Sequence, residues 1–134
     1  MASRDKKDLR PELVQAYEYA ANKYKELYPN EPQPFITCTY RSNEEQNKLY
    51  NQTPKVTNAK AGQSPHNYNP SFAFDIAFIT VDNKISWNSK YFKMFADCIK
   101  SDVVSWGGSW VNFKDAPHFE LKDWKTYIKT NNKW

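Results

Sequence analysis

Glycine, cysteine and histidine are all scarce in this chain of 134 residues, and each shortage limits the kinds of turn, disulfide or metal site that the protein can form. The only glycines are Gly62, Gly107 and Gly108, so each is a candidate for a backbone conformation that other residues avoid. The cysteines, Cys38 and Cys98, form no C-x-x-C pair. Cys38 lies in a strand-like run and Cys98 in a helix-like run, which predicts two buried thiols and no disulfide.

Long apolar runs are also missing. No stretch is long and apolar enough to span a bilayer, and the charged residues 1–7 lack the apolar core of a signal peptide. We therefore expect no membrane partner and a cytoplasmic starting point. Lys and Arg outnumber Asp and Glu by 19 to 15, but this excess is spread along the chain and forms no dense basic stripe, which argues against a nucleic-acid partner.

Aromatic residues are abundant by contrast, with 8 Phe, 9 Tyr and 5 Trp. The length predicts one domain, residues 1–134, with a core from about residue 9 to residue 121. Helices and strands mix without regular β-α-β alternation, which predicts the α+β class: a small antiparallel sheet flanked by helices. Periodicity predicts helices over 9–28, 42–50, 88–100 and from 123 onward, strands over 35–40, 72–79 and 102–106, and short extended pieces over 110–113 and 118–121.

Two local patterns suggest where a site would form. In the strand 72–79 bulky residues alternate with small ones, and Asp75 lies between two alanines on the small face, where a metal ion has room. Arg41 lies between a strand and a helix, because Ser42 and Glu45 have the spacing of a helix-capping box. The polar, proline-containing loop 51–71 is long enough to be functional or disordered.

The two histidines complete a plausible metal site. His66 and His118 with Asp75 are a sufficient ligand set for a catalytic zinc that keeps its fourth position for water. Asp115 is three residues before His118 and is suited to act as the general base, and Arg41 is suited to stabilise charge. Taken singly, a loop histidine is usually a surface residue and a strand aspartate a scaffold residue. On spacing and chemistry alone, a metal site and ordinary surface or scaffold roles for these residues are equally favoured.

Several motifs, in the same order along the chain, resemble the VanY/M15 group of zinc peptidases. The closest resemblance is to the L-alanyl-D-glutamate endopeptidase branch, which includes phage endolysins and bacterial wall hydrolases. It covers about residues 35–121 and rests on the segments 41–50, 56–68, 73–75, 106–110 and 115–119.

The resemblance implies a hedgehog/DD-peptidase-like fold and a role for each matching residue. His66, Asp75 and His118 would bind Zn²⁺, Asp115 would be the catalytic acid/base, and Arg41 would contact substrate or transition state. Four further residues are expected to contact substrate or support the ligands, although for the last of them a surface charge is favoured: Ser64, Gln46, Trp110 and Glu120.

The sequence departs from the family pattern between the first two ligands. Nine positions separate His66 from Asp75 where the family has seven, Ser71 replaces a glycine, and Asn69-Pro70 looks inserted. An even insertion keeps strand parity, so Asp75 should still point to the same face.

These inferences predict a monomeric zinc peptidase that cuts the peptidoglycan stem peptide at the L-Ala–D-Glu bond. A phage endolysin released from the host cytoplasm, or a bacterial autolysin, is the expected source. The alternative within the class is a D-Ala-D-Ala carboxypeptidase. The alternative from another class is a cell-wall binding module with a structural metal site, against which Asp115 argues. No separate wall-binding domain is recognisable.

Overall fold

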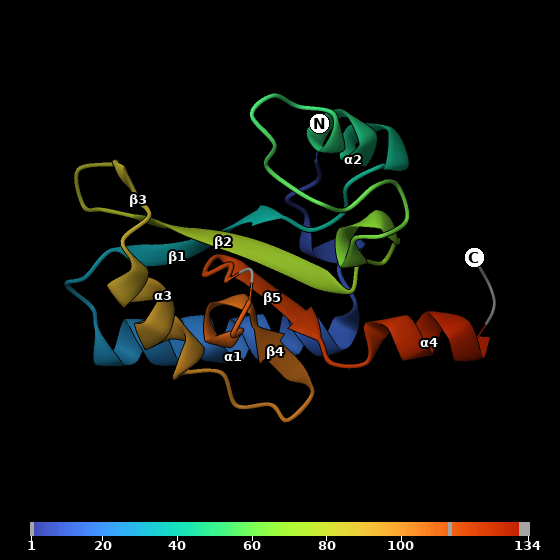
Figure 1. Ribbon diagram of the computed structural model, residues 1–134. Helices are drawn as coiled ribbons and strands as arrows, with labels where there is room; N and C mark the ends of the chain where they lie inside the picture. The colour runs from blue at the N-terminus through green and yellow to red at the C-terminus, as the bar shows by residue number, and fades with distance from the viewer. Residues whose placement is uncertain (1, 113, 132–134) are drawn as a thin grey trace.

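A computed structural model describes residues 2–112 and 114–131 of the chain (Figure 1). The described residues contain no helix with the length and apolar character needed to cross a membrane. The helices are α1 (Pro11–Leu27), α2 (Asn43–Tyr50), α3 (Ser89–Ala96) and α4 (Trp124–Asn131), with 3-10 turns η1 (Lys6–Asp8), η2 (Pro65–Asn67) and η3 (Gly107–Ser109). The strands are β1 (Gln33–Cys38), β2 (Ala73–Ile79), β3 (Ile85–Ser86), β4 (Val104–Trp106) and β5 (His118–Leu121).

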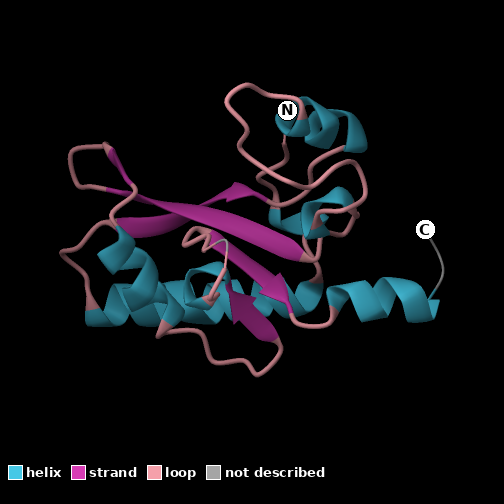
Figure 2. Cartoon of the chain, viewed as in Figure 1, coloured by secondary structure: helices cyan, strands magenta, loops and turns pink. Residues whose placement is uncertain are grey.

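The strands form one sheet in the order β1-β2-β5-β4, with β3 paired to β2 beside this path. All the pairings are antiparallel. Helices α1 and α3 lie on one side of the sheet, and α2 with the loop that follows it lies on the other (Figures 1 and 2). The predicted α+β class, with a small antiparallel sheet and flanking helices, is confirmed.

The core lies between the sheet and helices α1 and α3, and it is built from aromatic rings. The bulky side of β2 contributes Phe74 and Phe78, which are fully buried. Phe74 packs edge-on against Tyr17 of α1 at 5.5 Å between ring centroids, and Phe78 packs against Phe92 of α3 at 5.0 Å. Burying side chains of this size contributes about 1.5–3 kcal/mol each, so this face fixes the orientation of β2. The small side of the strand, with Asp75, therefore points away from α1 and α3.

Several helix boundaries follow the predicted caps. Ser42 accepts a hydrogen bond from the Glu45 amide at 3.1 Å and begins α2. Asn88 accepts one from the Lys90 amide at 3.0 Å and begins α3, which ends at Ala96 and is therefore shorter than the predicted 88–100.

The structure adds detail in three places. Trp110 is extended, as expected for 110–113, but residues 110–112 join no strand of the described sheet; residue 113 lies outside the described residues. The short strand β3 was not predicted, because it follows its turn directly and pairs only through two residues. The loop 51–71, expected to be functional or disordered, contains η2 and with it His66.

The N-terminal segment is hydrogen-bonded to the chain at two places, after β1 and before β2. Ser3 exchanges backbone hydrogen bonds with residues 39 and 40, just beyond β1. Ser71 bonds through its amide to the Asp8 carbonyl at 2.7 Å and through its carbonyl to the Arg10 amide at 3.1 Å. The chain is thus anchored directly after the inserted Asn69-Pro70 and immediately before β2, which keeps the register of that strand.

Candidate active site

The sheet itself places three of the site side chains in a row. Asp75, in the middle of β2, pairs with His118 on β5 and with Cys38 at the end of β1. Directly paired residues of antiparallel strands project to the same face, so these three side chains stand beside one another. His66 reaches the same place from η2, which packs against β2.

The two imidazoles converge on one oxygen of Asp75. His66 Nε2 lies 3.2 Å and His118 Nδ1 2.9 Å from Asp75 Oδ1. Two ligand atoms each about 2.0–2.1 Å from one tetrahedral zinc lie about 3.3 Å apart, so the two nitrogen–oxygen separations suit a shared metal ion. The imidazoles are almost fully buried, whereas 22% of the Asp75 side chain is exposed, which leaves one side of the group open. The donor set therefore fits a catalytic metal.

The other nitrogen of each ring is held by the protein. His66 Nδ1 lies 2.8 Å from the carbonyl oxygen of Thr39, an acceptor that requires a proton on Nδ1 and leaves the Nε2 lone pair free for a metal. His118 Nε2 lies 2.7 Å from Glu120, whose second oxygen accepts a hydrogen bond from the Trp124 indole at 3.1 Å. Such outer contacts orient ligands and raise their basicity.

Glu120 thus corrects the expectation of a surface charge. It lies half-buried behind His118 because residues two apart on a strand share a face. Ser64, expected to contact substrate or support the ligands, caps η2: its hydroxyl accepts a hydrogen bond from the His66 amide at 3.2 Å, and the Ser64 amide donates to the Asn67 side chain. The cap orients the turn that carries His66.

The charges of the group are strongly coupled. Burial disfavours the charged form of His66 and His118, but the Asp75 carboxylate beside them outweighs burial and raises the pKa of both rings. Burial likewise opposes ionisation of Asp75, yet the two imidazoles lower its pKa well below the ordinary range. The raised pKa of both rings means that protons compete with a metal ion for the ring nitrogens that face Asp75.

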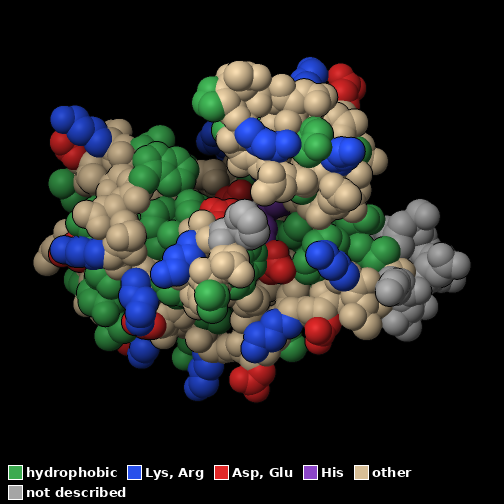
Figure 3. Space-filling view, viewed as in Figure 1, with side chains coloured by type: hydrophobic (Ala, Val, Ile, Leu, Met, Phe, Trp, Pro, Cys, Tyr) green, Lys and Arg blue, Asp and Glu red, His purple; other side chains and the backbone are tan. Residues whose placement is uncertain are grey.

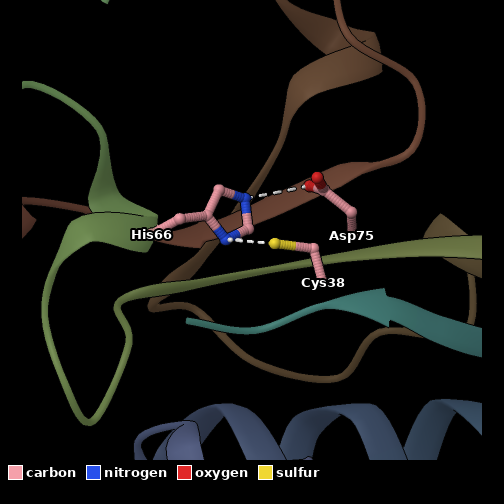
Figure 4. A group of neighbouring side chains, drawn as sticks. All are labelled: Cys38, His66 and Asp75. Atoms are coloured by element: carbon pink, nitrogen blue, oxygen red, sulfur yellow. Dashed lines mark hydrogen bonds and ion pairs between the residues drawn. The ribbon is translucent and has the colours of Figure 1, made fainter. Parts of the chain in front are cut away.

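Cys38 is a neighbour that the sequence motifs did not reveal. With His66 and Asp75 it forms a group whose potential ligand atoms lie within 4.8 Å of one another (Figure 4). Its sulfur, however, lies 3.5 Å from His66 Nδ1, on the side of the ring opposite to Asp75. Because Nδ1 already faces the Thr39 carbonyl, we assign the metal-facing role to His118 and not to Cys38.

Asp115 is positioned by a close backbone contact. Its amide donates to the Gly107 carbonyl at 3.0 Å, and its carbonyl accepts from the His118 amide at 3.1 Å. A Cβ atom on Gly107 would lie 2.3 Å from the Asp115 carbonyl oxygen, so only glycine permits this approach. Loss of solvent around the carboxylate, with the negative charge of Asp75 nearby, raises the pKa of Asp115.

Arg41 lies on the α2 side of the site. Its guanidinium donates to the Gln46 side chain at 3.0 Å, and Gln46 in turn donates to the Ala59 carbonyl at 2.8 Å. The guanidinium is therefore held in place between β1 and the loop after α2. Seven of the predicted site residues line one cavity of about 190 Å³: Arg41, Gln46, Ser64, His66, Asp75, Asp115 and His118.

Trp110 lies outside this small cavity. Its ring meets His118 edge-on at 5.6 Å and lines a larger neighbouring cavity. In the space-filling view, histidine and acidic side chains are visible in a hollow below the part of the molecule that contains α2 (Figure 3). Sequence reasoning missed Cys38, the Thr39 carbonyl and Trp124. No motif spacing in the sequence singles out a backbone carbonyl, or a tryptophan six residues beyond His118.

Comparisons with known proteins agree with this geometry. A family model described as D-alanyl-D-alanine carboxypeptidase, of peptidase family M15, matches residues 57–121. The chain is 37% identical over 100 residues to the peptidoglycan L-alanyl-D-glutamate endopeptidase CwlK of Bacillus subtilis (strain 168). That alignment covers 64% of this chain and 59% of the Bacillus protein, so the chain spans about three-fifths of the relative's length.

A solved structure shares the fold over nearly the whole chain. The L-Ala D-Glu endopeptidase ChiX of Serratia marcescens superposes with a TM-score of 0.68 and 21% sequence identity, covering 95% of this chain and 92% of that one. At 21% identity, the structural similarity shows a shared fold only. Residues 57–121, which match the M15 family model, include His66, Asp75, Asp115 and His118.

Proposed function

We propose that this protein is a zinc-dependent peptidase that hydrolyses the L-Ala–D-Glu bond of the peptidoglycan stem peptide. The observation that carries the proposal is the convergence of His66 Nε2 and His118 Nδ1 on one oxygen of Asp75, beside Asp115. A structural metal site needs no carboxylate of raised pKa in the same cavity, whereas hydrolysis needs one.

His66, Asp75 and His118 are the residues that would hold the metal. A zinc ion bound there would act as a Lewis acid that polarises the scissile carbonyl and lowers the pKa of water to about 7. The Thr39 carbonyl and Glu120 keep each imidazole turned with the correct nitrogen toward Asp75. This preorganisation means that the ligands need little rearrangement when the metal arrives.

Asp115 is suited to move the proton. It would accept a proton from the attacking water and deliver it to the nitrogen of the leaving D-Glu residue, so that the carboxylate is regenerated in each turnover. Its raised pKa brings it closer to neutral pH, where a general base also becomes an effective acid.

Arg41 is suited to stabilise negative charge. Its guanidinium lines the same cavity as Asp115 and is fixed by Gln46, so it presents a positioned cation to the oxyanion that develops on the scissile carbonyl, or to a substrate carboxylate. A fixed cation contributes more to catalysis than a mobile one because it requires no reorganisation during the reaction.

Digestion of purified peptidoglycan followed by mass spectrometry tests the proposal. We expect new N-terminal D-Glu ends from the zinc-loaded protein and none from the Asp115→Asn variant. Binding to the wall without any released peptide would instead indicate a binding module with a structural metal.

A D-Ala-D-Ala carboxypeptidase is the second candidate, because the matching family model carries that description. The same digest separates the two activities, since a carboxypeptidase would release free D-Ala and create no D-Glu ends. The Bacillus relative is named as a peptidoglycan endopeptidase, which favours action at the cell wall. We propose that this chain acts there as a single catalytic domain and as a monomer, after leaving the cytoplasm of a host cell.

A further inference from the structure

A second and much larger cavity adjoins the candidate metal centre. Its volume is about 1060 Å³, compared with about 190 Å³ for the cavity around the histidines. The two cavities share Val56, Thr57 and Asp115 in their walls. A chain that extends from the metal centre past Asp115 therefore enters the larger cavity, whose size matches a ligand of several residues.

Three aromatic rings line this cavity beside Val56, Ala59 and Ile128, and the polar atoms of the rings are already used by the protein. The Trp110 indole donates to Ser105 at 3.2 Å. The Trp124 indole donates to Glu120 at 3.1 Å, and the Tyr68 hydroxyl donates to a backbone carbonyl at 2.8 Å. What these rings offer to an occupant is therefore hydrocarbon surface, which suits aliphatic parts of a ligand.

The charged part of the lining is mainly positive. Lys114 and Lys125 line the cavity with exposed side chains, and the structure gives neither of them an ion pair with a carboxylate of residues 2–112 or 114–131. The Lys125 ammonium instead lies 5.7 Å from the centre of the Trp124 ring. Asp115 is the one acidic residue in the described lining, and it lies at the border with the metal centre. The cavity beyond Asp115 thus complements a partly aliphatic ligand that presents carboxylates to the two lysines.

We propose that this cavity binds the carboxylate-bearing peptide on the D-Glu side of the scissile bond, with Lys114 and Lys125 contacting its carboxylates. This proposal rests on the proposed function and names the part of the substrate that the cavity recognises. Downstream of the bond the stem peptide carries free carboxylates, whereas on the other side the L-Ala is joined to an uncharged sugar. The two lysines therefore favour the peptide over the glycan as occupant.

Equilibrium binding of the two cleavage products tests the assignment without any turnover. The probes are the tripeptide γ-D-Glu-L-Lys-D-Ala and N-acetylmuramyl-L-alanine, titrated into zinc-loaded protein by calorimetry. We expect the tripeptide to bind about two- to fivefold more weakly for each lysine replaced in Lys114→Ala and Lys125→Ala, and more weakly as salt rises. Arginine at either position should restore binding, and Lys84→Ala, an exposed lysine in the β2–β3 turn, should leave it unchanged.

Equal tripeptide affinity in the wild type and in the double alanine variant would overturn the assignment. So would a loss of affinity confined to N-acetylmuramyl-L-alanine, which would assign the cavity to the glycan. The cleavage assay is read separately. Lysine-dependent tripeptide binding without D-Glu ends would remove the proposed bond but keep the cavity's ligand, whereas cleavage with lysine-independent binding would remove only the ligand assignment.

Discussion

The two aspartates of the site, Asp75 and Asp115, have opposite electrostatic surroundings. Imidazoles hold the pKa of Asp75 down, while loss of solvent and the charge of Asp75 raise the pKa of Asp115. We predict that Asp115→Asn keeps its metal but lowers kcat/KM by about 10²–10⁴, because the amide cannot accept a proton. Muropeptide kinetics with metal analysis of the same sample would measure both quantities.

Asp97→Asn is the matched control for this substitution. Asp97 is exposed at the end of α3 and is paired with Lys93, so its loss should leave kcat/KM unchanged. Turnover in Asp115→Asn close to that of the wild type would remove Asp115 from the proposed proton transfer.

Glu120 joins a ligand to the wall of the large cavity. Its two oxygens bond to His118 Nε2 and to the Trp124 indole, so both positions need an acceptor. In Glu120→Gln the amide NH₂ would face one of two donors, and His118 would lose a charged partner. We expect zinc affinity to fall about 10- to 100-fold, measured by competition with a chromogenic chelator.

The exposed Glu44 on α2 supplies the control, since Glu44→Gln alters the same chemical group at a surface position paired with Lys48. Unchanged zinc affinity in Glu120→Gln would mean that His118 is oriented by its strand alone.

At the scale of elements, the connection from β4 to β5 holds Asp115 against the backbone of Gly107. Asp115 and Gly107 approach so closely that a Cβ atom would lie 2.3 Å from the Asp115 carbonyl oxygen, which is backbone and cannot move aside easily. We predict that Gly107→Ala displaces Asp115 and lowers kcat by about 10- to 100-fold, since a misplacement of about 1 Å costs that much.

Ser109→Ala, in the same turn, should be nearly neutral and serves as the comparison. Both variants should show wild-type circular dichroism. Full activity in a folded Gly107→Ala protein would show that the turn tolerates the shift and that Asp115 is not placed by this contact.

The elements that the sequence predicted well are those with strong local signals. Strand β2 follows from its alternation of Phe and Ala, and α2 follows from the cap formed by Ser42. Strand β3 and the turn η3 have no such signal, since their conformation depends on pairing with distant residues. For this reason the sequence does not show that residues 110–112, although Trp110 is extended, join no strand of the described sheet.

The same distinction applies to the site. His66, Asp75 and His118 were found from residue type and motif, and the structure brings them together, while their ligand role stays a prediction. The Thr39 carbonyl is invisible to any motif because every residue carries one, and Cys38 becomes a neighbour only through the register of β1 on β2.

At the scale of the whole molecule, the proposed metal would join three elements, η2, β2 and β5. His66 precedes β2, Asp75 lies within it, and His118 begins β5. A ligand that binds only the folded state stabilises it in proportion to the logarithm of its concentration over Kd. Metal binding should therefore raise the melting temperature, and the size of this effect should depend on pH because protons compete for the same nitrogens.

The sign of that dependence follows from the raised pKa of His66 and His118 in the metal-free protein. Proton binding stabilises the metal-free fold fully below the unfolded pKa of about 6.5, and this contribution is lost as pH rises toward the raised folded values. Asp75, whose pKa is lowered, stays ionised across this range. We therefore expect the free energy of stabilisation by zinc to increase between pH 6 and pH 8 by up to about 1.4 kcal/mol per pH unit for each proton displaced, and the melting-temperature gain to increase with it. Melting curves of zinc-loaded and chelated protein at three pH values measure the gain, and His118→Gln should flatten its slope. A gain that stays constant or shrinks as pH rises would mean that the metal does not replace protons on these two rings.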